Sequence, residues 1–295
     1  MRKYRTGLPD RDVGSTHPLR GRMGEVVAVP ELPEIHNLAG QMDAELTGES
    51  ISGAEVRQEK CLNLPVEEFV RTTAGEVIEG ADAHGKWILV RLASGKRLLV
   101  NLGMGADLRY HESGSSSDDF QVQLHLGRPS LSFRFWWFGH VHLVAPDDVA
   151  QHSQTAVLGP DALDRDLTED CFLELLQGRR GRIKSFLLNQ RNLAGIGNVY
   201  IQDILYRAGL HPERQIPSIP EDRRRQLYRV IRENLEEALR LGGIAHEKDL
   251  CGRRGRLEGF LVGYREGEEC PGCGTVIEKI RVGSTASYIC PQCQR

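Results

Sequence analysis

Four cysteines near the end of the chain have the spacing of a metal site. Cys270 and Cys273 stand in CPGCG, and Cys290 and Cys293 stand in CPQCQ. Each Cys-x-x-Cys pair fits a tight turn that brings two thiolates to one tetrahedral ion, and Zn²⁺ offsets their mutual repulsion. Four cysteine ligands leave no open position, so we expect one structural zinc. A redox dithiol is the competing interpretation, but two pairs at this spacing favour zinc.

A glycine-rich turn is the second feature that could do chemistry. The segment AGIGN, Ala194 to Asn198, separates two helical patterns, and its glycines, Gly195 and Gly197, permit positive φ and a close backbone approach. If a helix begins at Asn198, its free N–H groups and a carboxamide point outwards together, which suits a DNA phosphate. A plain corner between helices, capped by Asn198, is an alternative that the spacing leaves open.

A proline–glutamate box, VAVPELPEI, precedes the first helical pattern. Pro30 and Pro33 suit the first turn of a helix, and Glu31 and Glu34 suit the positive end of its dipole. The residues alone favour this structural role.

The segments after the box predict a helix and then a β-rich domain. IHNLAGQMDAEL places Ile35, Leu38, Met42 and Leu46 on one helical face. Short strand-like runs separated by turn residues follow, which is typical of an antiparallel sandwich or barrel. These runs are ISGAEVRQ, KWILVRL, KRLLVNLGM, FQVQLHL, LSFRFWWF and HVHLV, and GSSSDD, around residues 113–119, is expected to be a loop.

After residue 157 the pattern changes to helices. LTEDCFLELLQG begins with a capping candidate at Thr168, and RIKSFLLNQ, NVYIQDILYRAGL and RRRQLYRVIRENLEEALR follow. VIEKIRVG and ASYI, between the cysteine pairs, suit a hairpin. We therefore expect an α+β chain of several domains: an antiparallel β-sandwich with flanking helices (30–150), a helical domain (157–260) and a zinc-bearing β-hairpin (262–295).

The composition is that of a globular protein. Of 295 residues, 27% are charged and 40% are hydrophobic, and no window approaches the roughly 18 uncharged residues of a membrane span. Without a secretory signal, we expect a protein of the bacterial cytoplasm, at the nucleoid. The net charge is −3, but residues 179–256 hold 17 Lys and Arg against 9 Asp and Glu. This surplus suits a phosphate-rich partner, although a solvated Arg/Glu helical face is the simpler explanation.

Several of these segments together resemble the formamidopyrimidine-DNA glycosylase/endonuclease VIII family. QRNLAGIGNVYIQDILYRAGLHP is similar to the family's helix–two-turns–helix motif, and the resemblance runs from Pro30 to the C-terminus through PELPEI, LGM, FG, LGPDAL, IKSFLLNQ and the zinc finger. It implies a monomeric DNA-repair enzyme that binds double-stranded DNA with a damaged base or an abasic site between two lobes. The implied activities are N-glycosylase and AP lyase.

The resemblance also implies a catalytic role for the proline–glutamate box. The family uses the α-amine of an N-terminal proline, here matched by Pro30, and a secondary amine can form an iminium with a sugar aldehyde. Glu31 matches the residue that protonates the sugar ring oxygen, and Glu34 matches a second carboxylate near the start of the helix. Lys86 matches a lysine that contacts the phosphate at the lesion; taken alone, it would be an edge-strand charge.

Further residues are expected to contact DNA. Asn198 matches the family's phosphate-binding asparagine, and Met104 and Phe138 match residues that fill the space left by an extruded base. Taken alone, Met104 and Phe138 would suit a core. The other expected contacts are Trp136, Trp137, Gly195, Gly197 and Arg281.

Three departures from the family pattern weaken a particular lesion preference. Trp136 and Trp137 stand where oxidised-purine enzymes commonly carry two arginines, and Trp can stack on bases but cannot pair with them as Arg does. Thr285 stands where the finger usually carries an arginine, and GGIAHEKDL lacks the usual Thr-Arg-Asp-like sequence. An oxidised-guanine specialist is not expected. A catalytically inactive paralogue that binds damaged or branched DNA is the alternative function, and an RNA-binding module is a weaker one.

The fourth departure concerns the position of Pro30. Its nitrogen is an amide in the printed sequence, and an amide cannot form an iminium. Residues 1–29 lack any sustained period, so we expect a disordered or mis-annotated extension. A GTG codon at Val29 would act as a bacterial start, and residues 24–26 (GEV) can be encoded by a purine-rich ribosome-binding sequence. Removal of the initiator methionine would then leave Pro30 with a free amine.

Overall fold

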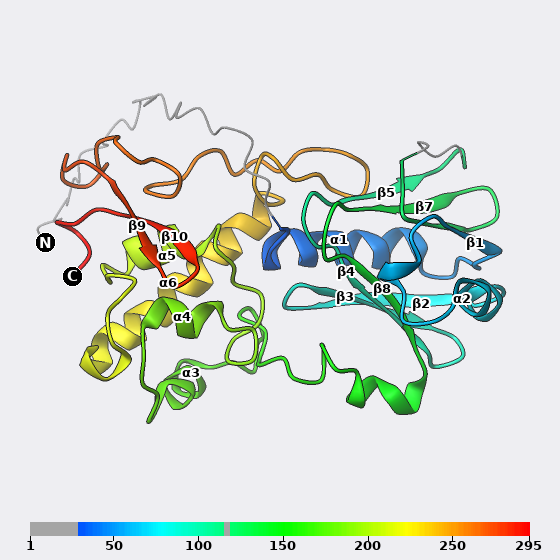
Figure 1. The fold of residues 1–295 in the computed structure, drawn as a ribbon, viewed down its shortest axis with the longest axis horizontal. Helices are drawn as coiled ribbons and strands as arrows, with labels where there is room; N and C mark the ends of the chain where they lie inside the picture. The colour runs from blue at the N-terminus through cyan, green and yellow to red at the C-terminus, as the bar shows by residue number, and fades with distance from the viewer. Residues whose placement is uncertain (1–28, 115–118) are drawn as a thin grey trace, which may run out of the picture.

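The computed structural model describes residues 29–114 and 119–295 (Figure 1). Two lobes lie on either side of the start of the first helix, with the helical lobe on the left and the sheets on the right. Residues 1–28 of the predicted extension (1–29), and residues 115–118 of the predicted loop, lie outside the described residues. Within the described ranges, no helix is long and apolar enough to cross a membrane.

The N-terminal lobe is a sandwich of two four-stranded sheets. Their strand orders are β1-β6-β7-β5 and β2-β3-β4-β8, and every pairing within them is antiparallel. The strands are β1 (Gly53–Val56), β2 (Ile78–His84), β3 (Trp87–Leu92), β4 (Arg97–Asn101), β5 (Asp107–His111), β6 (Val122–His125), β7 (Ser130–Arg134) and β8 (His140–Val144). The lobe also holds the helices α1 (Leu32–Leu46), η1 (Glu59–Cys61), α2 (Val66–Thr73) and η2 (Pro146–Gln151).

Five elements of this lobe were not predicted, and several predicted strands were too long. The strands β2 and β5 and the helices η1, α2 and η2 were missed. A bulge between Ile78 and Gly80 breaks the alternation of β2, and β5 is short and largely polar. The strand predicted for LSFRFWWF ends at Arg134, and the segment after it is a loop with a positive φ of 61° at Phe138.

The helical lobe contains the helices expected after residue 157. They are α3 (Glu169–Leu176), α4 (Ile183–Leu188), α5 (Ile201–Arg207) and α6 (Glu221–Arg240), with a short helix η3 (Ile216–Ser218). Thr168 caps α3, since its hydroxyl oxygen accepts a hydrogen bond from the Cys171 N–H at 3.2 Å. The predicted cap is therefore confirmed, although a cysteine at the third position cannot complete a capping box.

The first helix contributes to both lobes. The predicted apolar face is confirmed, because Ile35, Leu38, Met42 and Leu46 are buried in the sandwich core. Leu32, the first residue of α1, belongs instead to the core of the helical lobe. The start of α1 is therefore fixed by the packing of both lobes.

The predicted C-terminal hairpin is also present, so the α+β fold class is confirmed. The strands β9 (Glu278–Val282) and β10 (Thr285–Ile289) pair antiparallel. Lys184 of α4 is 1% exposed and holds the hairpin, since its ammonium donates to the Ala286 carbonyl at 2.6 Å and to the Ser287 hydroxyl at 2.7 Å. Burial lowers the pKa of Lys184 to about 8.

Candidate active site and nucleic-acid interface

The four predicted cysteines come together at the base of the hairpin. The Sγ atoms of Cys270, Cys273, Cys290 and Cys293 all lie within 4.8 Å of one another. Cys273 is 3.4 Å from both Cys290 and Cys293, and Cys270 is 3.9 Å from Cys293. A tetrahedral zinc with bonds of about 2.3 Å requires sulfurs about 3.8 Å apart. The four thiolates fit one structural zinc, which they would hold without an open position.

Glu31 lies where the two lobes meet, and its carboxylate fills the glycine turn. Its Oε2 accepts a hydrogen bond from the Gly197 N–H at 2.7 Å and one from the Tyr200 N–H at 3.4 Å, and its Oε1 accepts one from the Val199 N–H at 2.8 Å. The turn is thus an anion site, as predicted, but these N–H groups point inwards. The anion they bind is the neighbour of Pro30, and the expected outward orientation was wrong.

Glu34 is the second buried carboxyl of the site. Its Oε2 accepts the Glu31 N–H at 3.0 Å, while its Oε1 accepts the Tyr200 hydroxyl and the Ile244 N–H at 3.0 Å. Burial raises the pKa of Glu34 above its ordinary value. The sequence predicted Glu34 near the start of the helix but missed Tyr200, which belongs to an ordinary helical pattern.

The two glycines of the turn are buried and permit close packing. Gly195 has a φ of +106°, and a Cβ there would lie 2.4 Å from the Leu32 side chain. A Cβ on Gly197 would lie 2.1 Å from the Glu31 Oε1 and 2.3 Å from the Lys86 Nζ. Lys86 follows Gly85 in the turn between β2 and β3, so the structure brings it to Glu31. Neither glycine lies on the surface, and a contact of either one with DNA stays a prediction.

Asn198 lies three residues before α5, which corrects the prediction that a helix begins there. The side chain is half-buried, and its Oδ1 accepts a hydrogen bond from Gln202 Nε2 at 3.1 Å. Gln202 also accepts the Tyr288 N–H of β10 at 3.0 Å. The glycine turn is therefore joined to the finger. A phosphate contact by Asn198 stays a prediction.

The predicted aromatic residues form an exposed loop between β7 and β8. Trp136, Trp137 and Phe138 are 58%, 65% and 78% exposed. Met104 holds the loop, because its N–H donates to the Trp137 carbonyl at 2.9 Å and its carbonyl accepts the Trp136 N–H at 2.8 Å. The Trp136 ring lies against Gly105, where a Cβ would be 2.6 Å from the indole. The structure thus brings the four predicted residues together and leaves the three rings uncovered.

Arg281 and Thr285 occupy the hairpin of the finger. Arg281 is exposed on β9 opposite Ala286, and Thr285 begins β10. The contact of Arg281 with DNA stays a prediction, since its side chain meets only the Gly283 carbonyl, at 3.3 Å, among the described residues.

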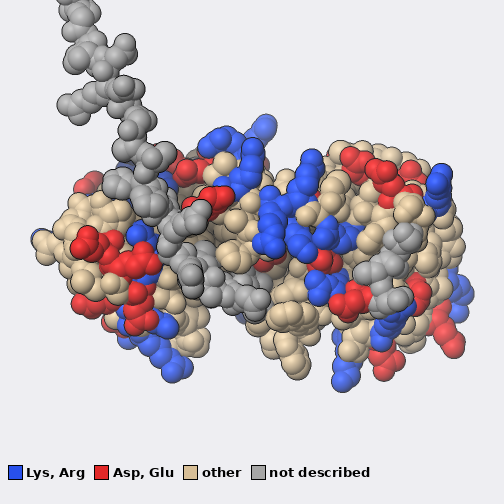
Figure 2. All heavy atoms as spheres, turned by 90° about the horizontal axis from the view of Figure 1, so that it is seen from above, with Lys and Arg blue, Asp and Glu red and all other residues tan. Residues whose placement is uncertain are grey.

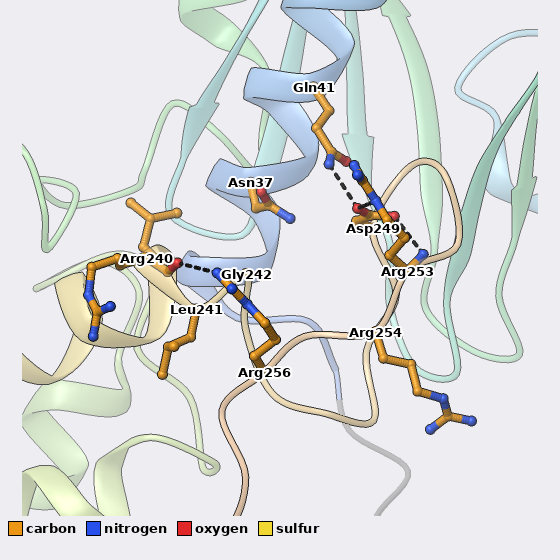
Figure 3. Close-up of a pocket in the computed structure, with 10 residues that line it drawn as sticks. Asn37, Gln41, Arg240, Leu241, Gly242, Asp249, Arg253, Arg254 and Arg256 are labelled. Atoms are coloured by element: carbon orange, nitrogen blue, oxygen red, sulfur yellow. Dashed lines mark hydrogen bonds and ion pairs between the residues drawn. The ribbon is translucent and has the colours of Figure 1, made fainter.

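A basic pocket lies between the lobes, beside the loop that follows α6. Figure 2 shows Lys and Arg side chains gathered near the middle of the face seen from above. The pocket has a volume of about 390 Å³, and Gln41 and Arg253 both reach Asp249 on its wall (Figure 3). Its lining also includes Asn37, Arg240, Arg254 and Arg256. The charge surplus predicted for 179–256 is thus partly concentrated here.

The loop of residues 242–256, the connecting loop, crosses from α6 to the sandwich above α1 (Figure 1). Leu250 is fully buried in the sandwich core, and its carbonyl accepts the Tyr110 N–H of β5 at 3.0 Å. Gln41 of α1 donates to Asp249 at 3.0 Å and accepts the Leu250 N–H at 2.8 Å. The only expectation for this loop was its departure from the family pattern.

Comparisons with known proteins agree with this architecture. The sequence profile of the formamidopyrimidine-DNA glycosylase N-terminal domain matches residues 29–136, and that of the H2TH domain of the same proteins matches 158–249. A zinc-finger profile found in these glycosylases and in isoleucyl-tRNA synthetases matches 267–295.

Whole-chain relatives carry the same name. The formamidopyrimidine-DNA glycosylase of Chloroflexus aurantiacus is 35% identical over 90% of this chain and 98% of its own length. That of Streptococcus pneumoniae is 31% identical over 90% of this chain and 99% of its own. The Lactococcus lactis enzyme bound to DNA that contains N7-benzyl-Fapy-dG superimposes with a TM-score of 0.84 at 27% identity, over 90% of this chain and all of that one. The chain belongs to the formamidopyrimidine-DNA glycosylase family.

Proposed function

We propose that this chain is a base-excision repair enzyme, a DNA N-glycosylase with AP-lyase activity in which Pro30 is the nucleophile. One observation carries the proposal. The carboxylate next to Pro30 is fixed by the backbone N–H groups of Gly197, Val199 and Tyr200. The site also includes Glu34 and Lys86. Such a site fixes an acid–base group beside the nucleophile before any substrate binds.

The chemistry follows from a free secondary amine at Pro30. Its lone pair attacks C1′ of the damaged nucleotide, and the bond from C1′ to the base breaks, so that the base leaves with the electron pair and a proton. The proton of the attached amine passes to the Glu31 carboxylate, which delivers it to the ring oxygen as the bond from C1′ to that oxygen breaks and the nitrogen lone pair forms the iminium. The iminium accepts electrons when C2′ loses a proton and the 3′ phosphate leaves. Lys86 would pair with the phosphate at the lesion.

The DNA surface in this proposal consists of the basic pocket, the aromatic loop and the finger. Trp136, Trp137 and Phe138 are free to enter the duplex once a base has left the stack. We further propose domains at 30–150, 157–260 and 262–295, and a monomer that works at the nucleoid. The described Lactococcus lactis complexes contain DNA with a Fapy-dG or an abasic site, which supports a damaged or baseless nucleotide as substrate.

Borohydride trapping on abasic-site DNA tests the proposal. Protein that starts at Pro30 should form a covalent adduct, and protein that keeps residues 1–29 should not, since its Pro30 nitrogen is an amide. Pro30→Ala should lose most of the adduct. Tight binding by the Pro30-start protein without any adduct would instead identify the inactive DNA-binding paralogue.

This chemistry requires that translation starts at Val29, and the mass of the native protein tests that start. The match of the N-terminal family profile begins at residue 29, one residue before the proposed nucleophile. We expect a native mass that begins at Pro30. A native chain that begins at Met1 or Met23 would contradict the start at Val29.

A further inference from the structure

Tyr206 extends from the last turn of α5 to the finger. Its half-buried ring packs against the finger's own core, which consists of Val262, Cys270, Ile277, Tyr288 and Cys290. Its hydroxyl oxygen lies 3.2 Å from the Sγ of Cys270, which is 3% exposed. A side chain of the helical lobe therefore reaches one of the four zinc ligands.

The chemistry of the zinc site decides which atom donates this hydrogen bond. Cysteine binds zinc as a thiolate, which has no proton, so the Tyr206 hydroxyl is the donor. Hydrogen bonds to charged acceptors are about twice as strong as those between neutral groups. Cys270 is buried and has little access to water, and four thiolates carry more negative charge than one Zn²⁺ offsets. A hydroxyl donor at this position therefore stabilises the metal-bound form of the site.

The turn of residues 270–273, which holds the first two cysteines, leaves space for the hydroxyl. Gly272 belongs to this turn, and a Cβ there would lie 2.7 Å from the Tyr206 hydroxyl oxygen. The next nearest atoms to that Cβ would be the sulfurs of Cys270 and Cys293, at 3.8 and 3.9 Å. A residue with a Cβ at position 272 would thus displace the hydroxyl and leave both sulfurs in ordinary contact.

The second cysteine turn of the finger is docked on the segment that follows α5. The Gln294 side-chain amide donates to the Leu210 carbonyl at 3.1 Å, and its oxygen accepts the Cys290 N–H at 3.0 Å. Both cysteine turns are therefore held against the end of α5. The fold, and not a free rotation of the phenol, keeps the Tyr206 hydroxyl beside Cys270.

We propose that Tyr206 is an outer hydrogen-bond partner of the zinc site, whose hydroxyl stabilises the Cys270 thiolate and slows the loss of the metal. The inference does not depend on the proposed repair chemistry, because it concerns the retention of zinc. It gives α5 a contact at each end. The Tyr200 hydroxyl, just before the helix, donates to Glu34 of the candidate active site, and Tyr206 in the last turn holds the zinc-bound finger.

The rate of zinc release tests the proposal. The full chain loaded with zinc is mixed with an excess of a coloured chelator, and absorbance follows the metal as it leaves. Tyr206→Phe, which loses only the hydroxyl, should release zinc faster by about tenfold or more, because loss of an outer partner usually costs about 10–100-fold in metal affinity. Tyr228→Phe is the matched control. It loses a hydroxyl that donates to the Leu167 carbonyl at 2.6 Å in the same lobe, and it should release zinc at the wild-type rate.

Gly272→Ala provides an independent test, because it displaces the hydroxyl without removing it. With Tyr206 present, Gly272→Ala should speed zinc release. In the Tyr206→Phe background the added Cβ has no hydroxyl to meet, so the same change should alter the release rate by less than about twofold.

Replacement of zinc by Co²⁺ adds a readout that a loss of folding stability would not move. The charge-transfer absorption of the cobalt–thiolate bonds should shift to lower energy in Tyr206→Phe, because a thiolate that has lost its hydrogen bond gives up electrons more readily. Tyr228→Phe should keep the wild-type spectrum.

Three results would overturn the inference. Zinc release at the wild-type rate in Tyr206→Phe, an equal acceleration in Tyr228→Phe, or an equal effect of Gly272→Ala with and without the Tyr206 hydroxyl would each do so. The second result would show that the stability of the helical lobe controls release, and the third that residue 272 acts on the cysteine turn directly. Failure of the proposed function looks different, because it would abolish trapping on abasic-site DNA and leave zinc release unchanged.

Discussion

The carboxylate of Glu31 accepts a hydrogen bond from the backbone of Gly197, 166 residues further along the chain, at 2.7 Å. Glu31 precedes α1 in the sandwich lobe, and Gly197 belongs to the glycine turn of the helical lobe. The proposed acid–base group is therefore positioned by a lobe other than its own.

Gly197→Ala should disrupt this contact. The added Cβ would lie 2.1 Å from the Glu31 Oε1 and 2.3 Å from the Lys86 Nζ, so both charged groups must move. A misplaced catalytic group costs on the order of 100-fold, and we expect that loss in both excision and abasic-site cleavage, measured under single-turnover conditions.

Gly40→Ala is the matched control. Gly40 lies on the exposed side of α1, and a Cβ there meets nothing within 4 Å. The change should raise the free energy of unfolding by about 0.5–1 kcal/mol, because alanine favours a helix, and leave both activities intact. Normal activity in Gly197→Ala would contradict the assigned role of the turn.

Trp137→Ala should weaken binding to an abasic-site duplex. Stacking of a base on an aromatic ring is worth about 1–3 kcal/mol, so the Kd should rise between about 5-fold and 150-fold in a fluorescence-anisotropy titration at fixed salt. Val157→Ala, which alters a residue that is 41% exposed, is the control and should bind normally. An unchanged Kd for Trp137→Ala would show that the ring stays outside the duplex.

The tryptophans should also reduce discrimination of the base opposite the lesion. An indole has one N–H donor and no acceptor, so it cannot form the paired hydrogen bonds with a base edge that arginine forms. Excision rates with the four opposite bases should therefore be similar, because stacking on an aromatic ring tolerates every base. Trp137→Arg should widen the differences among them, and a strong wild-type preference for one opposite base would contradict this reading of the loop.

Removal of zinc should unfold the finger. We expect one zinc per chain by elemental analysis, little zinc in Cys290→Ser, and a DNA affinity at least about tenfold lower, because a finger of this kind folds only around its metal. Cys251→Ser changes an exposed cysteine outside the cluster and should retain zinc and affinity. Full affinity without zinc would show that the hairpin folds and binds without the metal.

The burial of Lys184 should make the free energy of unfolding depend on pH in the alkaline range. Its pKa is lowered from the ordinary 10.5 to about 8 in the folded protein, so between these values the unfolded chain binds the extra proton. Stability linked to this group therefore rises with pH across that window, by a total on the order of 3 kcal/mol. The free energy of unfolding of the wild type, minus that of Lys184→Met, should show this rise in denaturant titrations. A flat difference would mean that the ammonium is solvated.

The sequence predicted the features that depend on residue type and local spacing. The cysteine ligands, the apolar face of α1 and the cap at Thr168 are local patterns. β2 was missed because its bulge at Gly80 interrupts the alternation on which such predictions depend. The turn of the aromatic loop was missed because a positive φ is usually signalled by a glycine, and residue 138 is a phenylalanine.

The interior of the site depended on tertiary packing that no local pattern encodes. Gly197 was correctly expected to permit a close approach, but its neighbour is Glu31 and not a phosphate, since the direction of the N–H groups is set by how the lobes meet. Tyr200 carried no signal, because it lies in an ordinary helical pattern. The resemblance supplied Pro30, Glu31, Glu34 and Lys86 as candidate catalytic residues, and it could not indicate a residue outside the family pattern.

Because α1 contributes to two cores, the proposed active site assembles only when both lobes are folded. Leu32 packs in one lobe and Ile35 in the other, so the Glu31 carboxylate takes its fixed orientation beside Pro30 only after both lobes have folded and joined. In a nascent or partly unfolded chain, the same carboxylate would lack the N–H groups of the helical lobe that hold it. The proposed strand cleavage would in this way be fast only in completely folded molecules.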